Sequence, residues 1–262
     1  AGPGPSKHRL EPLFKNPDDY VRWRNTAAPV ALPKADIKTY RDNAVFLGID
    51  SGSTTTKIII LGKDRQILFS WYADNSGDPI GEVYKGLDAF RQQVQFHGLP
   101  IVISQSAVTG YGEDLIRTAF SLDMGVVETI AHYTAARFVD PRVSFILDIG
   151  GQDMKAMFLD QGIISRIELN EACSSGCGSF LQTLAASVNT DIETFARMAC
   201  KAETPCDLGT RCTVFMNSKI KQSLRENASI ADISAGLSYS VIKNCLFKVL
   251  KLRDMTEMGD HI

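Results

Sequence analysis

The sequence lacks several features that would place it at once in a large class of proteins. No apolar run is long enough to span a bilayer, and the N-terminus has neither the basic start nor the apolar core of a signal peptide. Basic and acidic residues nearly balance, 28 against 30, so charge gives no reason to expect nucleic acid or an anionic membrane as a partner. We therefore expect a cytoplasmic protein that binds neither.

Cysteine is scarce, and two common nucleotide-binding motifs are missing. The chain has 6 cysteines in 262 residues. In a reducing compartment these are thiols, core residues or metal ligands rather than a disulfide framework. No GxxxxGK[ST] sequence is present, and no GxGxxG follows a predicted strand. A P-loop and a dinucleotide-binding loop of the Rossmann type are thus excluded.

The chain does contain an α/β pattern, which follows a proline-rich start. Six of the 10 prolines lie in the first 33 residues, so we expect residues 1–43 to form an arm or linker. From Ala44 onward, strand-like apolar runs alternate with helical patterns such as the one over residues 80–94. With 44% hydrophobic residues, the chain suffices for one large or two ordinary domains.

Two helices near the C-terminus are predicted in more detail. Thr190 followed by Glu193 is a capping box, which marks the start of a helix. Further on, apolar residues recur every four positions and predict one long helix with a buried face; they are Ile233, Leu237, Val241, Cys245 and Val249.

One short pattern occurs twice in the chain. An apolar strand ends in aspartate, glycine follows two residues later, lysine follows seven residues later, and a second apolar strand begins. The residues are Asp50, Gly52 and Lys57 in the first copy and Asp148, Gly150 and Lys155 in the second. We therefore predict two strand–loop–strand hairpins of the same kind.

The residue types in these hairpins suit a phosphate chain and its metal ion. Glycine permits a positive φ or a close approach of backbone N–H groups to an anion. Asp50 and Asp148 are carboxylates of the kind that hold water molecules around Mg²⁺. One such turn alone is usually only a turn, but a matched pair favours phosphate binding from both sides. Further donors for phosphate are offered by Ser51, Gly52, Ser53, Thr54, Thr55, Thr56, Gly150 and Gly151.

Other polar side chains of the hairpins leave two interpretations open. Lys57 and Lys155 either contact phosphate or are outward-facing strand residues. Gln152 and Asp153 either position the water that attacks phosphorus or only fix the turn. We treat Lys57 as a candidate cofactor-binding residue, and the catalytic candidates are Asp50, Asp148, Gln152 and Asp153.

Four ordered segments resemble a known family. They are LGIDSGSTTTK at residues 47–57, VTGYGEDLI at 108–116, ILDIGGQDMK at 146–155 and NEACSSGCGSF at 170–180. They are similar to the BadF/BadG/BcrA/BcrD-type ATPases, which comprise activators of 2-hydroxyacyl-CoA dehydratases and ATP-binding subunits of benzoyl-CoA reductase. These proteins belong to the acetate kinase, sugar kinase, Hsp70 and actin superfamily. The likeness runs from about residue 44 to the end and is greatest to long, multidomain members.

The resemblance implies an α/β fold of two RNase H-like lobes, residues 44–144 and 145–262, with a nucleotide cleft between them. It also implies hydrolysis of ATP with Mg²⁺, coupled to low-potential electron transfer. The electron passes from a [4Fe–4S] cluster shared in a dimer to a 2-hydroxyacyl-CoA dehydratase or benzoyl-CoA reductase-like partner. A homodimer, or pairing with a second activator-like domain, is therefore expected. Because no glycine pair follows the long C-terminal helix, we expect the second lobe to be C-terminally incomplete and nucleotide binding to be weak.

The cysteines match the family only in part. Cys173 matches one cluster ligand, but the other falls at Ala131. Cys177 offers a second thiolate, and two chains that each contributed Cys173 and Cys177 would supply four. A helix that begins near Ser179 would point its N–H groups at the anionic cluster. The alternative is that both cysteines are small residues of a glycine-rich turn. The remaining four are expected to be structural: Cys200, Cys206, Cys212 and Cys245.

Two other functions stay open on the sequence. A small-molecule kinase of the same superfamily, such as an aminosugar kinase, would need an acidic base that faces a sugar pocket. A nucleotide-responsive interaction module would change conformation with ATP without hydrolysing it.

Overall fold

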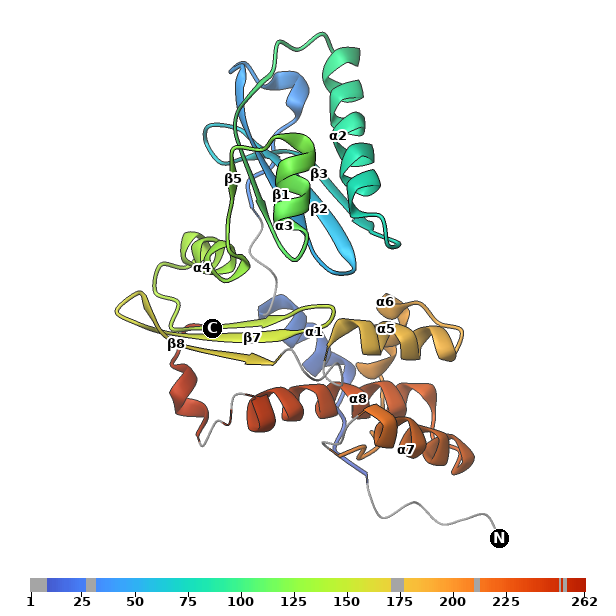
Figure 1. Cartoon of the computed structure of the whole chain (residues 1–262). Helices are drawn as coiled ribbons and strands as arrows, with labels where there is room; N and C mark the ends of the chain where they lie inside the picture. Colours follow the sequence, from blue (N-terminus) through green and yellow to red (C-terminus); the bar gives the residue numbers. More distant parts are fainter. Residues whose placement is uncertain (1–8, 27–31, 171–176, 210–212, 250, 252–253) are drawn as a thin grey trace. The chain divides into compact units, whose positions relative to one another are not determined.

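The computed structural model describes residues 9–26, 32–170, 177–209, 213–249, 251 and 254–262 (Figure 1). The chain divides into two compact units. One unit comprises residues 30–139, and the other combines residues 1–29 with residues 140–262. The predicted α/β class is confirmed, because each unit contains a sheet together with helices.

The unit of residues 30–139 is built on a five-stranded sheet in the order β3-β2-β1-β4-β5. Its first three strands are antiparallel, whereas β4 runs parallel to β1 and β5 runs parallel to β4. The strands are β1 (Ala44–Ser51), β2 (Thr55–Leu61), β3 (Ile67–Asp74), β4 (Val102–Thr109) and β5 (Met124–Gly125). Because β1 and β4 are parallel, their carboxyl ends meet at the same edge of the sheet.

The helices of this unit are α2 (Pro79–Phe96), α3 (Glu113–Phe120), α4 (Glu128–Val139) and the short 3₁₀ helix η1 (Ile37–Thr39). The predicted helix over residues 80–94 is confirmed by α2. Asp78 caps it, since its Oδ1 accepts from the Gly81 N–H at 2.9 Å. Val83 and Phe90 of α2 pack on the sheet residues Ile58 and Ile60 in one apolar core.

The sheet of the other unit has three antiparallel strands in the order β6-β7-β8. They are β6 (Phe145–Ile149), β7 (Met154–Asp160) and β8 (Ile163–Asn170). The helices are α1 (Pro17–Thr26), α5 (Gly178–Ser187), α6 (Ile192–Ala199), α7 (Thr213–Arg225), α8 (Ile230–Asn244), η3 (Cys245–Val249, a π-helix) and η4 (Met255–Met258, a 3₁₀ helix).

Both helix predictions for the C-terminal region hold, with one correction. The apolar stripe is buried at Ile233, Leu237 and Val241 of α8 and at Cys245 of η3. Helix α6 begins where expected, but its N-cap is Asp191 rather than Thr190. The Asp191 Oδ1 accepts from the Thr194 N–H at 2.8 Å, and a carboxylate at this place also interacts favourably with the helix dipole.

Residues 9–11 of the predicted arm are held against the helical part of their own unit. Arg9 forms a β-bridge with Cys206, and the Leu10 N–H donates to the Pro205 carbonyl at 2.8 Å. The Tyr239 hydroxyl donates to the Glu11 carbonyl at 3.1 Å. Backbone bonds of this kind order a segment that composition alone predicts to be irregular.

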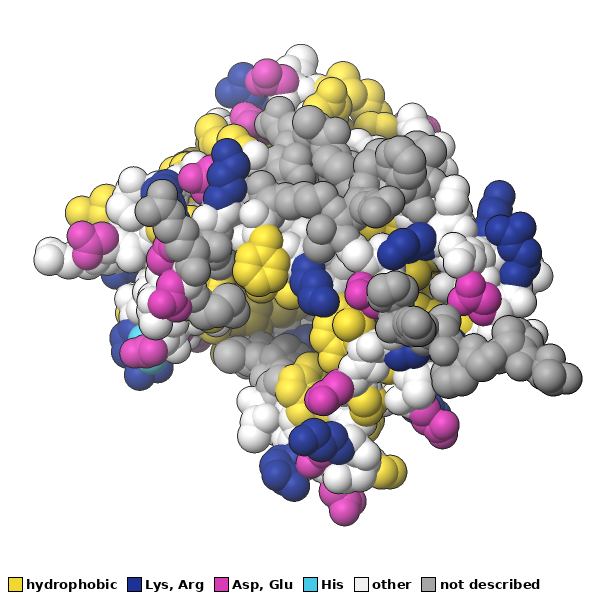
Figure 2. Space-filling view, turned by 90° about the horizontal axis from the view of Figure 1, so that it is seen from below, with side chains coloured by type: hydrophobic (Ala, Val, Ile, Leu, Met, Phe, Trp, Pro, Cys, Tyr) yellow, Lys and Arg dark blue, Asp and Glu magenta, His cyan; other side chains and the backbone are white. Residues whose placement is uncertain are grey.

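One face of the molecule is mixed in charge. On the face shown in Figure 2, basic and acidic side chains are interspersed among hydrophobic and uncharged ones. No helix in the described part of the chain has both the length and the apolar character needed to cross a membrane.

Candidate functional site

The first predicted hairpin joins β1 to β2. The Gly52 N–H donates to the Thr55 carbonyl at 2.9 Å, which closes the turn around Ser53 and Thr54. Asp50 faces Lys57 across the ladder. The Lys57 Nζ lies 2.8 Å from the Asp50 Oδ2, with the lysine side chain 43% exposed. Lys57 is therefore not a plain outward-facing strand residue, because it is paired with Asp50, and its contact with phosphate stays a prediction.

The second hairpin joins β6 to β7 and repeats this geometry. The Gly150 N–H donates to the Asp153 carbonyl at 3.0 Å, and Asp148 faces Lys155. The Lys155 Nζ lies 2.8 Å from the Asp153 Oδ2 and 4.0 Å from the Asp148 Oδ2. The lysine side chain is only 8% exposed. The prediction of two hairpins of one kind is thus confirmed for their backbone structure.

The glycines after the two aspartates differ in how closely they are surrounded, and a Cβ at Gly52 would meet only the Thr55 carbonyl oxygen, at 3.4 Å. Neither Gly52 nor Gly150 has a positive φ, so that option is wrong for both. A Cβ added at Gly150 would lie 2.5 Å from the Asp153 Oδ1. A side chain at this position would displace the Asp153 carboxylate, so the close approach is the reason for glycine here.

Each hairpin is anchored by the start of a helix further along the chain. The N–H of Gly112, the N-cap of α3, donates to the Ser51 carbonyl at 2.9 Å. The Gly178 and Ser179 N–H groups of α5 donate to the carbonyls of Gly150 and Gly151, both at 2.9 Å. Helix α5 therefore begins near Ser179 as predicted. Its first two N–H groups, however, are used by the hairpin and are not directed at a cluster.

Two side-chain oxygens of the first hairpin are buried without a hydrogen-bond partner, Asp50 Oδ1 and Ser51 Oγ. Buried polar atoms normally have partners, and a carboxylate oxygen in this state has acceptor capacity that the protein does not use. Carboxylate and hydroxyl oxygens are the donors that Mg²⁺ and its water molecules prefer. The first hairpin thus fits the predicted metal ion through the Asp50 Oδ1.

The Thr56 hydroxyl is used within the protein. Its side chain is fully buried, and its Oγ1 donates to the Asn75 Oδ1 at 2.5 Å. The Asn75 Nδ2 in turn donates to the Gly52 carbonyl at 2.8 Å. Thr56 therefore supports the turn through Asn75 instead of offering a donor to phosphate. Sequence reasoning missed Asn75, which lies 19 residues from Thr56 and carries no motif.

The residues of the two hairpin loops differ in their exposure to solvent. Ser53 and Gln152 are exposed, whereas Thr54, Thr55, Gly151 and Asp153 are partly buried. The Asp153 carboxylate is paired with Lys155, which agrees with the interpretation that it fixes the turn. Gln152 keeps its amide at the exposed tip, where it can reach a ligand.

The two cysteines proposed as cluster ligands cannot both be placed. Cys173 lies outside the described residues. Cys177 is fully buried, in one apolar cluster with Phe145, Val241 and Cys245. Burial and the nearby Cys177 thiol raise the pKa of Cys245 to about 11. A thiol in this apolar setting does not fit a ligand to a cluster shared between chains, and it favours the alternative that Cys177 is a packing residue.

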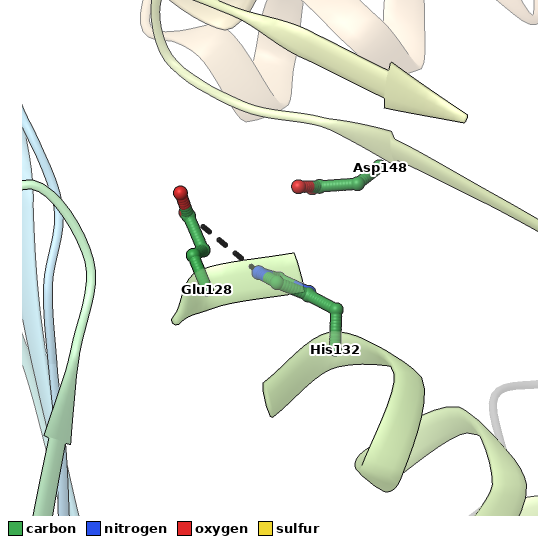
Figure 3. Close-up of side chains that lie close together, drawn as sticks. All are labelled: Glu128, His132 and Asp148. Carbon is green, nitrogen blue, oxygen red and sulfur yellow. Dashed lines mark ion pairs between the residues drawn. The ribbon is translucent and has the colours of Figure 1, made fainter. Parts of the chain in front are cut away.

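The other cysteines and the α4 histidine have structural surroundings. Burial raises the pKa of Cys200 and of Cys206, so both thiols are protonated at neutral pH; Cys212 lies outside the described residues. On α4, the His132 Nε2 lies 3.7 Å from the Glu128 Oε1 (Figure 3). Asp148, drawn in the same figure, belongs to the other unit.

The comparisons with known proteins agree with the motifs. The chain is 29% identical over 201 residues to the (R)-2-hydroxyglutaryl-CoA dehydratase activating ATPase of Acidaminococcus fermentans, which covers 74% of this chain and 73% of that protein. It is 32% identical over 198 residues to the activator of lactoyl-CoA dehydratase of Anaerotignum propionicum, which again covers 74% of this chain and 73% of that protein.

Solved structures give the fold. The activator of the 2-hydroxyisocaproyl-CoA dehydratase from Clostridium difficile, with bound ADPNP, matches with a TM-score of 0.69 and 30% identity over 80% of this chain and 78% of that one. The Acidaminococcus fermentans (R)-2-hydroxyglutaryl-CoA dehydratase component A matches with a TM-score of 0.68 and 24% identity, over 82% and 84% of the two chains. The predicted actin- and Hsp70-like ATPase fold is thereby confirmed.

A family model matches residues 47–258, which is most of the described chain and includes both hairpins. This range contains all four segments on which the sequence resemblance rests. The chain therefore belongs to the BadF/BadG/BcrA/BcrD ATPase family.

Proposed function

We propose that this ATPase uses residues of its two hairpins to hydrolyse Mg²⁺-ATP and thereby activates an acyl-CoA dehydratase or reductase component. The observation that carries the proposal is the shared turn: Gly52 and Gly150 close identical loops, each two residues after an aspartate. The relatives named as dehydratase activators support the kind of partner. The ADPNP in a neighbouring structure supports the nucleotide.

The chain's own residues would divide the task as follows. Asp50 and Asp148 would hold Mg²⁺, which neutralises charge on the phosphates when it is bound. The Asp50 Oδ1 is the atom available for this, because Lys57 holds the other carboxylate oxygen. Gln152, at the exposed tip of the second hairpin, would orient the attacking water. Ser53 and Thr54, at the tip of the first hairpin, would contact phosphate.

Activation of a partner requires that ATP favours one conformation of the protein. A ligand shifts such an equilibrium only by the difference in its affinity for the two states. Hydrolysis removes the γ-phosphate and returns the protein to the other state. The anchoring of both loops by α3 and α5 gives a direct route by which a bound phosphate would act on helices, through the Ser51, Gly150 and Gly151 carbonyls.

The rate of ATP hydrolysis, measured in matched aspartate variants, tests the proposal. We expect Mg²⁺-dependent release of phosphate from ATP by the wild type, and a loss of about 100-fold or more in both Asp50→Asn and Asp148→Asn. Asp64→Asn is the control, because Asp64 is exposed in the β2–β3 turn of the same protein. A wild type without hydrolysis, or aspartate variants as active as the control, would contradict the proposal. ADP formation that depends on a sugar would instead indicate a kinase.

The electron-transfer part of the proposal rests on Cys173 and the family resemblance, and no step above depends on a cluster. With Cys177 in the apolar core, each chain supplies one thiolate, Cys173, so a homodimer supplies only two of the four that a [4Fe–4S] cluster takes and the others would have to come from elsewhere. Any chromophore that anaerobic reconstitution with iron and sulfide gives in the wild type should then also form in Cys177→Ala. We expect none in Cys173→Ala, because Cys177 lies in the apolar core. Circular dichroism of both variants checks the fold. Loss of iron in a folded Cys177→Ala variant would restore Cys177 as a ligand.

A further inference from the structure

The carboxyl end of β4 carries a polar residue to which neither the motifs nor the comparisons assign a role. Thr109 is the last residue of β4 and faces Asp50 in the parallel ladder. Residues that face each other across neighbouring strands project from the same side of the sheet. Thr109, Asp50 and Lys57 thus form one row over β4, β1 and β2.

Two neighbouring oxygens of this row have no partner. The Thr109 Oγ1 and the Asp50 Oδ1 are both buried without a hydrogen bond. The second Asp50 oxygen, Oδ2, is held at 2.8 Å by the Lys57 Nζ. A buried hydroxyl or carboxylate oxygen without a partner costs free energy. Two such atoms on adjacent strands therefore indicate a ligand that would satisfy both.

The backbone beside these atoms leaves no place for a protein side chain. Gly110, which follows Thr109, has a φ of 93°. A Cβ at Gly110 would lie 2.8 Å from the Asp50 Oδ1 and 2.6 Å from the Ser51 carbonyl oxygen. Glycine thus brings the chain against the loop while leaving the Asp50 oxygen uncovered by a side chain.

The chemistry of the pair selects the ligand. A carboxylate oxygen only accepts hydrogen bonds and repels phosphate, whereas a hydroxyl both donates and accepts. A water molecule bound to a cation donates strongly to carboxylate and hydroxyl oxygens. Mg²⁺ retains several of its water molecules in protein sites. Ser51 Oγ is the third buried oxygen without a partner in this region, but the next residue along a strand projects from the opposite side of the sheet.

We propose that Thr109 is a positioning residue for the metal ion, its hydroxyl and the Asp50 Oδ1 together holding a water molecule of hydrated Mg²⁺. This inference rests on the proposed function, because it deepens the Mg²⁺-ATP site of the first hairpin. It assigns to the VTGYG segment a part in metal binding in addition to its glycine turn.

Removal of the Thr109 hydroxyl should have opposite effects on stability with and without ligand. Thr109→Val keeps the shape of the side chain and removes the hydroxyl. In EDTA, the midpoint of thermal unfolding should be unchanged or higher than that of the wild type, since a buried polar atom without a partner has been removed. Addition of Mg²⁺-ATP should raise the unfolding midpoint of the variant by less than it raises that of the wild type. Calorimetry should show Mg²⁺-ATP affinity reduced about tenfold, the loss of one hydrogen bond to a charged centre.

Three further measurements make the result specific. ATP affinity in EDTA should change by less than about twofold in Thr109→Val, because the hydroxyl acts on the metal and not on the nucleotide. Thr109→Ser should retain the response of the wild type. Thr118→Val, an exposed threonine on α3, should match the wild type in every assay.

The outcomes separate the two proposals. A wild type that does not bind Mg²⁺-ATP contradicts the proposed function and, with it, the ligand assigned to Thr109. A wild type that binds, together with a Thr109→Val variant of equal Mg²⁺-ATP affinity, overturns only the inference. A lower unfolding midpoint of Thr109→Val in EDTA would also overturn it, since the hydroxyl would then be satisfied within the protein.

Discussion

The two hairpins share a backbone but not an electrostatic environment. Both close with the same N–H to carbonyl bond, and both receive N–H groups from the start of a later helix. In the first hairpin a half-exposed Lys57 is paired with one carboxylate. In the second, Lys155 is 8% exposed and lies near the carboxylates of both Asp148 and Asp153. The repeated motif therefore determines the backbone of the turn. The burial and ion pairs of its charged side chains depend on the surrounding structure.

The strands that follow the hairpins explain this difference. Buried residues alternate with half-buried ones along β2, whereas five consecutive residues of β7 are buried, Met154 to Phe158. A strand covered on both faces has no solvent side for its lysine. Lys155 is consequently buried beside the carboxylates of Asp148 and Asp153. Asp153 occupies the position that Thr55 has in the first hairpin.

The largest expected contrast is between the two lysines. Lys155→Met removes the buried cation that pairs with Asp153 and lies 4.0 Å from Asp148, and it should lower the free energy of unfolding by about 3 kcal/mol. Lys57→Met removes a partly exposed ion pair and should lower it by less than about 1 kcal/mol. Urea unfolding of both variants measures the difference. Equal losses would show that the burial of Lys155 has no energetic consequence.

A second contrast concerns the anchoring of the loops. Gly110→Ala places a Cβ at a positive φ of 93° and against the Ser51 carbonyl, so we expect a loss of about 2 kcal/mol in the free energy of unfolding. At Gly178 an added Cβ would meet the Gly150 carbonyl only at 3.4 Å. Gly178→Ala should stay within about 0.5 kcal/mol of the wild type. Thermal unfolding of both variants measures the difference. Equal losses of stability would show that the positive φ and the close Ser51 carbonyl do not require glycine at position 110.

The smallest contrast lies at the matching loop positions Thr54 and Gln152. If Gln152 orients water, Gln152→Ala should lower kcat for ATP hydrolysis about tenfold at nearly constant KM. Thr54→Ala should mainly raise KM, by about threefold, through a lost phosphate contact. Steady-state kinetics of both variants distinguishes the two roles. Identical changes would mean that the hairpins contribute in the same way.

Local pattern was a good guide wherever a residue acts through its neighbours in the chain. The spacing of aspartate, glycine and lysine predicted both hairpins, and the apolar stripe predicted the buried face of α8 and η3. The cap of α6 was displaced by one residue, because Thr190 and Asp191 are both good caps and the carboxylate is the better acceptor beside a helix dipole.

Side-chain direction could not be predicted in the same way. Cys177 ends the CSSGC segment and is a candidate ligand on the sequence, yet it packs with Phe145 and Cys245, which are distant in sequence. Thr56 belongs to a run of hydroxyl residues, yet alternation along β2 turns it towards Asn75. Each outcome depends on which strand or helix lies opposite.

The sequence by itself therefore determined the α/β class, the two hairpins and the family, because these follow from periodicity and short spacings along one chain. Only the tertiary structure decided which polar atoms are satisfied and which are not. Thr109 faces Asp50 because β4 pairs with β1, although the whole segment 52–101 lies between these strands in the sequence. Whether a buried oxygen has a partner depends on such long-range neighbours, and no local pattern records them.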